Sequence, residues 1–160
     1  MRLPATALLL ASLVLLSGCG YKSNFTDQAL EQRFRSNEAD FNTLVKMFKE
    51  DSELSSVTFI AAFSSYDTRA NIPQQRLDEY RGLLKKLSLK NIWRGEKSGN
   101  IHLTTWKESD FVMGGANEAY VYTEFPPAEI TESLDELRKM TDAFAYKRIS
   151  DNWYLQVDNW

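Results

Sequence analysis

The chain has 160 residues, of which 43% are hydrophobic and 26% are charged, and its formal net charge is -3. This balance is typical of a globular protein, and the length fits one domain. The acidic excess argues against nucleic-acid binding, which usually relies on a strong basic excess. A single cysteine and a single histidine exclude an intramolecular disulfide framework and argue against cysteine- or histidine-rich metal sites. We therefore expect no metal and no cofactor.

A short apolar run opens the chain. Arg2 supplies a positive charge, and an apolar run of 12 residues follows from Ala5 to Leu16. A helix needs about 20 apolar residues to cross a bilayer, whereas this length suits the hydrophobic region of a secretory signal. The alternative is a buried N-terminal helix, but such a helix would carry polar residues at helical spacing. The run has almost none, so it favours a signal peptide.

The apolar run ends in the tetrad Leu16-Ser17-Gly18-Cys19. This tetrad resembles the lipobox of bacterial lipoproteins, in which signal peptidase II cuts before a diacylglyceryl-modified cysteine. The resemblance implies cleavage between Gly18 and Cys19 and acylation of Cys19, with palmitate among the attached chains. Two or more chains give stable anchoring, whereas one binds a membrane only marginally. Glycine stands at position 20, where enterobacterial lipoproteins of the inner membrane carry aspartate, so the resemblance implies the outer membrane.

We divide the chain into a signal peptide over residues 1–18, a lipidated cysteine with a short tether over residues 19–26, and one domain over residues 27–160. Removing 18 of the 160 residues leaves 142, which is enough for one sizeable core. The tether reaches only about 3.3 Å per residue. The domain is therefore expected close to the periplasmic side of the outer membrane, bound to the lipid bilayer through Cys19.

The first half of the domain alternates helices and strand. Apolar residues at spacings of three, four and seven predict a helix over about Asp27–Asp51, with Thr26 as its N-cap. The β-forming run Val57–Phe63 predicts a strand, and the polar stretch Ser64–Asn71 predicts a loop. A second helix is expected to start at Pro73 and to end near Leu87.

The second half is richer in strands. Turn residues separate short alternating runs, which is typical of hairpins. A third helix is expected after Pro126-Pro127, with Ile130, Leu134 and Leu137 on one face. The predicted strands are Ile92–Glu96, Ile101–Trp106, Asp110–Met113, Glu118–Glu124, Ala145–Ile149 and Trp153–Val157.

This order of elements predicts an α+β fold. We expect a single domain with a largely antiparallel sheet of about five or six strands and with helices packed on one face. The Val57 strand, the second helix and the Ile92 strand are interpreted as one parallel crossover.

No pattern assigns a catalytic residue. His102 lies on a predicted strand, and a histidine base would need a nucleophile and an orienting acid. No Gly-x-Ser-x-Gly elbow accompanies it. Acidic pairs such as Asp135/Glu136 have basic neighbours on predicted helices, so solvated faces explain them.

Four aromatic residues are candidates for a binding face: Trp106, Tyr120, Tyr122 and Tyr154. If the helices cover one side of the sheet, these residues would form an exposed patch on the other side. The alternative is that they complete the core, because the register between their strands decides which face each side chain joins.

The sequence thus predicts a non-catalytic lipoprotein that binds or scaffolds in the bacterial cell envelope, with an envelope protein or a glycan as its partner. The stretches FNTLVKMFKED, LDEYRGLLKKL and NWYLQVDNW also resemble small uncharacterised bacterial lipoproteins. The alternative function is an envelope hydrolase acting on cell-wall or glycan material, using His102 with an acidic residue. That alternative needs a concave site in which His102 meets a carboxylate.

Overall fold

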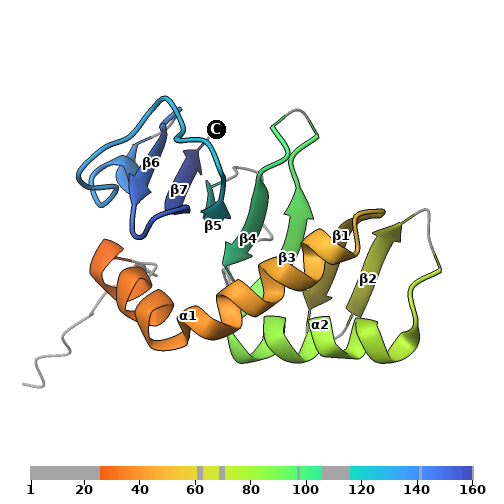
Figure 1. Cartoon of the computed structure of the whole chain (residues 1–160). Coiled ribbons are helices and arrows are strands. Elements are labelled where there is room, and N and C mark those ends of the chain that lie inside the picture. Colours follow the sequence, from red (N-terminus) through yellow and green to blue (C-terminus); the bar gives the residue numbers. More distant parts are fainter. Residues whose placement is uncertain are drawn as a thin grey trace, which may run out of the picture.

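The fold is taken from a computed structural model, which describes residues 26–60, 63–68, 71–96, 98–105, 116–140 and 142–159. The predicted signal peptide, Cys19, the predicted tether up to residue 25 and the predicted strand Asp110–Met113 lie outside the described residues. The elements follow one another along the chain in this order (Figure 1): α1 (Asp27–Glu50), β1 (Leu54–Ile60), β2 (Phe63–Thr68), α2 (Gln74–Lys86), β3 (Leu89–Arg94), β4 (Ile101–Thr105), β5 (Ala116–Tyr122), the 3-10 helix η1 (Leu137–Lys139), β6 (Phe144–Arg148) and β7 (Trp153–Asn159).

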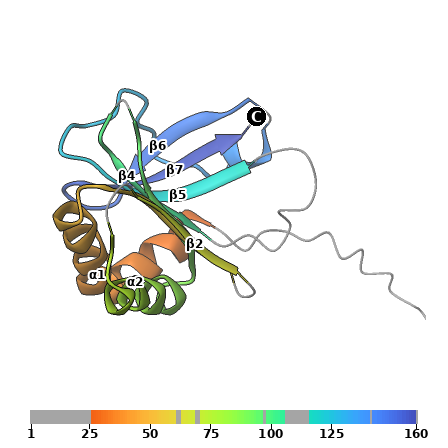
Figure 2. The ribbon, with the colours of Figure 1, turned by 90° about the vertical axis from the view of Figure 1, so that its right-hand side faces the viewer.

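The strands form one sheet in the order β2-β1-β3-β4-β5-β7-β6. Every neighbouring pair is antiparallel. Helices α1 and α2 lie together on one side of this sheet (Figure 2). The structure therefore confirms a single α+β domain with an antiparallel sheet and helices on one face. Its described residues form seven strands, where the sequence predicts five or six.

Helix α1 begins where the sequence predicts. Thr26 is its N-cap, with Oγ1 accepting a hydrogen bond from the Ala29 N–H at 3.2 Å. Asn37 has φ -135° and ψ 20°, so the helix is kinked there, and its side-chain amide donates to the Arg33 carbonyl at 2.9 Å. None of the helices within the described residues is both long and apolar enough to span a bilayer.

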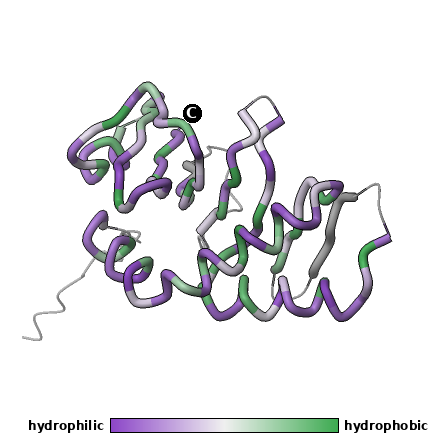
Figure 3. The backbone as a smooth tube through the Cα atoms, viewed as in Figure 1, coloured by the Kyte–Doolittle hydropathy of each residue, from purple (hydrophilic) through white to green (hydrophobic). Residues whose placement is uncertain are grey.

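The main core lies between the two helices and the sheet. Both helices alternate hydrophilic and hydrophobic residues along their length (Figure 3), as amphipathic helices on a sheet must. Phe34 and Phe41 of α1 lie on either side of the kink and contact Tyr120 and Trp153 of the sheet. Farther along α1, Phe48 meets Tyr80 of α2 edge-on at 6.2 Å between ring centroids. One long helix thus joins both halves of the sheet into one core.

The polar stretch predicted as a loop contains an edge strand. Strand β2 (Phe63–Thr68) pairs with β1 from Ile60↔Phe63 to Leu54↔Thr68. An edge strand pairs on one side only and needs few apolar residues, so polar composition does not distinguish it from a loop. The predicted parallel crossover between the Val57 and Ile92 strands is also wrong, because β1 and β3 are antiparallel neighbours. The chain first turns back through β2, and α2 then carries it across β1 to β3.

The predicted third helix is absent from the described residues after Pro127, where η1 (Leu137–Lys139) is the helical turn that forms. The backbone at residues 129–131 pairs with β6 instead. The Tyr146 N–H donates to the Glu129 carbonyl, and the Thr131 N–H donates to the Tyr146 carbonyl, both at 2.8 Å. Leu134 is fully buried while Ile130 is 48% exposed, so the two do not share a helical stripe. The spacing of the apolar residues favours a helix here, but the backbone hydrogen bonds to β6 determine the structure.

Candidate functional site

The predicted aromatic face is divided between the two sides of the sheet. Trp106 lies outside the described residues. Tyr120 is fully buried against α1, where its hydroxyl donates to the Leu30 carbonyl at 3.0 Å. Burial raises the pKa of Tyr120 far above its usual value. Tyr120 is therefore a core residue, which corrects its assignment to an exposed patch.

Tyr122 and Tyr154 also fail to share a patch. Tyr122 faces the helices, where its ring meets Trp153 edge-on at 5.4 Å between centroids, and Lys49 Nζ lies 4.4 Å from its centroid. Tyr154 lies on the opposite side, and only 3% of it is exposed. The register decides this, because Tyr122 pairs with Trp153 while Tyr154 pairs with Val121, and paired residues share a face.

We call the side of the sheet away from α1 and α2 the helix-free face. Two rows of side chains run across this face from β1 to β6. Within a row, each residue is the cross-strand partner of the residue on the neighbouring strand. The first row is Ser56, Trp93, His102, Val121, Tyr154 and Arg148. The second row is Thr58, Asn91, Thr104, Ala119, Gln156 and Tyr146.

The helix-free face has a buried part and a partly exposed part. A second apolar cluster of Ala119, Val121, Tyr146 and Tyr154 occupies the part over β5, β6 and β7. The part over β1, β3 and β4 is more open, and five of its residues are partly accessible: Ser56, Thr58, Asn91, Trp93 and Thr104. A ligand would therefore meet the β1–β3–β4 part of this face.

His102 joins the two parts and is itself 94% covered, with 6% exposed. Its Nδ1 lies 3.1 Å from Gln156 Oε1, a distance that suits an Nδ1–H donor. Its ring stacks on Trp93, with centroids 4.1 Å apart and planes 10° apart. The hydrolase hypothesis requires a carboxylate beside His102, whereas the side-chain partner found here is the amide of Gln156. Within the described ranges, no group of His, Cys, Asp and Glu residues is arranged to hold a metal ion.

Burial lowers the pKa of His102, although the hydrogen bond that the ring donates to Gln156 Oε1 opposes this shift. In the unfolded chain the ring should take up a proton as the pH falls through about 6.5, whereas the folded ring takes up its proton only at a lower pH. The free energy of unfolding should therefore be constant above that pH and should decrease between about pH 6.5 and 5.5. We expect His102→Gln to lose this slope, measured by urea unfolding at pH 7.5, 6.5 and 5.5. An equal slope in both proteins would contradict the prediction, because the chain has one histidine.

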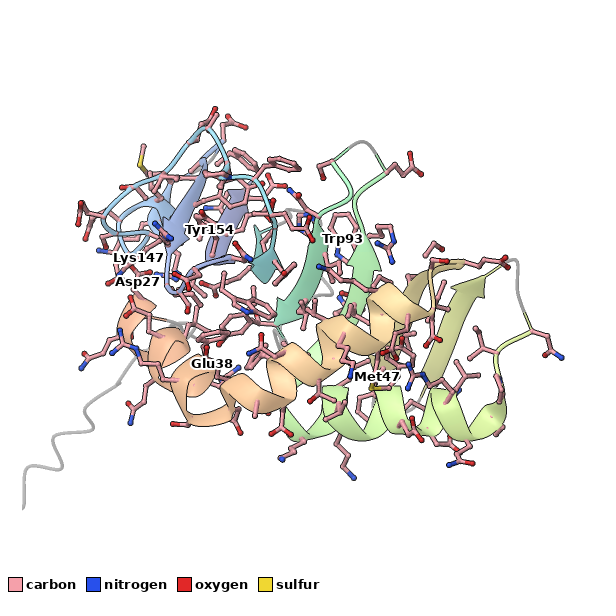
Figure 4. All side chains as sticks on the ribbon, viewed as in Figure 1. Asp27, Glu38, Met47, Trp93, Lys147 and Tyr154 are labelled. Atoms are coloured by element: carbon pink, nitrogen blue, oxygen red, sulfur yellow. The ribbon has the colours of Figure 1, made fainter. Side chains whose placement is uncertain are left out.

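A buried ionic cluster fixes the start of α1. The Asp27 carboxylate accepts from Arg138 Nη1 at 2.7 Å, from the Leu134 N–H at 2.9 Å and from Lys147 Nζ at 3.1 Å. Asp27 lies beside Lys147 of β6 (Figure 4). Burial alone would raise the pKa of Asp27, but these hydrogen bonds outweigh it and lower the pKa. The first residue of the domain is thus held by two separate segments of the chain, residues 134–138 and strand β6.

Arg138 connects this carboxylate to two more acidic residues. Its Nε lies 2.6 Å from Glu118 Oε1, and its Nη1 lies 2.6 Å from Asp135 Oδ1. The side chains of Arg138 and Glu118 are 11% and 1% exposed. Sequence reasoning did not single out this cluster. A signal was present, because Glu118 is two residues before the core residue Tyr120 and so shares its face.

A shallow hollow of about 390 Å³ lies on the helix side, and its lining residues are Asn42, Val45, Lys46, Lys49, Glu50 and Tyr122. Its two cations are already paired, Lys49 with Glu124 at 2.8 Å and Lys46 with Glu50 at 3.9 Å. Burial would lower the pKa of Lys49, but the contacts with Glu124 and Tyr122 outweigh it and raise the pKa. These pairings balance the charges of the hollow and give it no selectivity for a charged ligand.

Comparisons with protein-family models, with curated proteins and with solved structures found no match for this chain.

Proposed function

We propose that this protein is a lipid-anchored lipoprotein of the bacterial envelope, on the periplasmic side of the outer membrane, with a non-catalytic binding or scaffolding role. The support for the anchor is in the sequence. A short apolar run precedes Leu16-Ser17-Gly18-Cys19, and this cysteine is the only one in the chain. Acylation of Cys19 would supply the two or more chains that stable membrane binding needs.

The observation that carries a scaffolding role is the rigid attachment of Asp27. Asp27 follows Cys19 by eight residues, which span at most about 29 Å when fully extended. Asp27 is bound to Leu134, Arg138 and Lys147. The connection between Cys19 and the folded domain therefore ends at Asp27 and cannot become longer. An acylated Cys19 would therefore keep the domain beside the bilayer.

The chemistry of the helix-free face favours binding over catalysis. His102 is buried, is held by the amide of Gln156 and is stacked under Trp93. A general base needs access to the proton that it removes and a pKa near the working pH. Burial here lowers the pKa of His102. The ring thus supports Trp93 structurally, and the accessible surface above it consists of groups that recognise ligands.

The anchor is tested by Cys19→Ser in cells labelled with palmitate. We expect complete loss of the label and accumulation of the longer precursor, because serine has no thiol to accept the diacylglyceryl group. Ser17→Ala is the matched control, since it keeps a small residue in the tetrad and should be labelled and cleaved normally. Undiminished labelling of the Cys19→Ser protein would refute the anchor.

A further inference from the structure

The accessible part of the helix-free face carries no charged side chain in its two rows. Ser56 and Thr58 come from β1, Asn91 and Trp93 from β3, and Thr104 from β4. Three hydroxyls and one amide therefore surround one large aromatic ring. Beyond β1 the first row continues to Asp67 of β2, which pairs with Ser56, so the uncharged area is the part that β1, β3 and β4 form.

Trp93 is held in a fixed position. Its ring stacks on His102, which covers one of its two faces, and its Nε1–H donates to Thr104 Oγ1 at 3.4 Å. Trp93 is nevertheless 37% exposed, so its opposite ring face is accessible. An aromatic side chain that is already immobilised loses little conformational entropy when a ligand stacks on it.

The support for this position reaches across the sheet. His102 stands directly opposite Trp93 in the register of β3 and β4. Gln156 of β7 holds the imidazole of His102 from the far side, 3.1 Å from Nδ1. Both residues are buried, so they act as positioning residues and not as ligand contacts. Three strands thus orient one exposed indole.

We propose that this surface binds a neutral glycan, with Trp93 as the stacking platform and with the hydroxyls of Ser56 and Thr104 as donors and acceptors. The Asn91 amide would act as a donor through Nδ2, because its Oδ1 is buried. The ring face of tryptophan carries negative quadrupole charge and attracts the positively polarised C–H groups on the flat side of a pyranose ring. Hydroxyl groups both donate and accept hydrogen bonds, as sugar hydroxyls require. This inference adds a ligand class to the proposed binding role. It rests on the proposed function, because the proposed envelope location is where the protein would encounter the glycan.

The composition of the surface favours a glycan over other ligands. An acidic ligand would call for lysine or arginine, and the accessible part of the two rows has neither. The core of a protein interface is usually apolar, with several aromatic or aliphatic side chains together. Here a single aromatic ring is flanked by polar side chains, which fits a polar ligand with one apolar face.

The test uses the chain from residue 20 to residue 160. Every residue of both apolar clusters lies between Leu30 and Val157, so this chain retains the whole described core. The probes are the hexasaccharide of N-acetylglucosamine and cellohexaose, with binding measured by saturation-transfer NMR and calorimetry. We expect the protein to bind at least one of them and Trp93→Ala to lose at least tenfold in affinity. Trp93→Phe, which keeps an aromatic face, should lose less.

Phe144→Ala is the matched control, because Phe144 is a similarly exposed aromatic on β6 of the same face and should not affect binding. The proposal is overturned if neither oligosaccharide binds, or if Trp93→Ala binds as well as the unaltered chain. Trp93-dependent capture of a protein from envelopes, without binding of either sugar, would assign the surface to a protein and also overturn it. Since the tested chain lacks Cys19, this result is independent of the palmitate experiment.

Discussion

Replacement of Arg138 by methionine is expected to lower the free energy of unfolding by about 3–5 kcal/mol, the usual cost of removing one partner from a buried ion pair. Methionine fills a similar volume but removes the cation that Asp27 and Glu118 share. These two carboxylates have side chains only 5% and 1% exposed, so water cannot replace the guanidinium. Urea unfolding followed by circular dichroism measures the change.

Lys139→Met is the matched control for Arg138→Met. Lys139 is the next residue and also pairs with an acidic residue three positions earlier, Glu136, at 2.7 Å. Its side chain, however, is 68% exposed, and surface pairs contribute about 0–1 kcal/mol. If the two variants unfolded at the same urea concentration, the cluster around Arg138 would have no special role in stability.

Phe41→Ala is expected to cost about 3–5 kcal/mol, as large-to-small changes in a core do. Phe41 is fully buried, and its ring centroid lies 4.6 Å from that of Tyr120, 5.3 Å from that of Phe34 and 5.7 Å from that of Trp153. These neighbours come from α1, β5 and β7 and cannot all move into the space. The midpoint of urea unfolding should therefore fall sharply.

Phe125→Ala removes the same atoms from the surface and serves as the control. Phe125 is 79% exposed, so the change should stay within about 0.5 kcal/mol of zero. A small effect of Phe41→Ala, close to that of Phe125→Ala, would mean that Phe41 does not join α1 to the sheet in solution.

The helix ends and the hairpins were predictable because local rules produce them. Thr26 caps α1, and Pro73 precedes α2, as the sequence predicts. The hairpin of β6 and β7 also forms where turn residues interrupt two alternating runs. Each of these features depends on residues within a few positions of one another, so no knowledge of the rest of the chain was needed.

The errors have one physical origin, which is pairing between distant segments. The spacing of Ile130, Leu134 and Leu137 favours a helix, but the backbone at residues 129–131 pairs with Tyr146. Strand β2 likewise exists because β1 supplies its hydrogen bonds. A strand obtains its hydrogen bonds from elsewhere in the chain. Its own sequence therefore does not determine whether it forms.

The residues of the candidate sites were harder to predict than the strands, because their positions depend still more on tertiary structure. The sequence alone gives the lipobox-like tetrad at Cys19, because that signal is a contiguous pattern in the chain. It also gives one α+β domain, because hydrophobic periodicity is local. Only the register placed Tyr120 in the core and Trp93 on the accessible face, since a shift of one residue moves every side chain of a strand to the other side. Only the fold brought Asp27 to Arg138, 111 residues away, where their attraction and hydrogen bonds offset the cost of burying both charges.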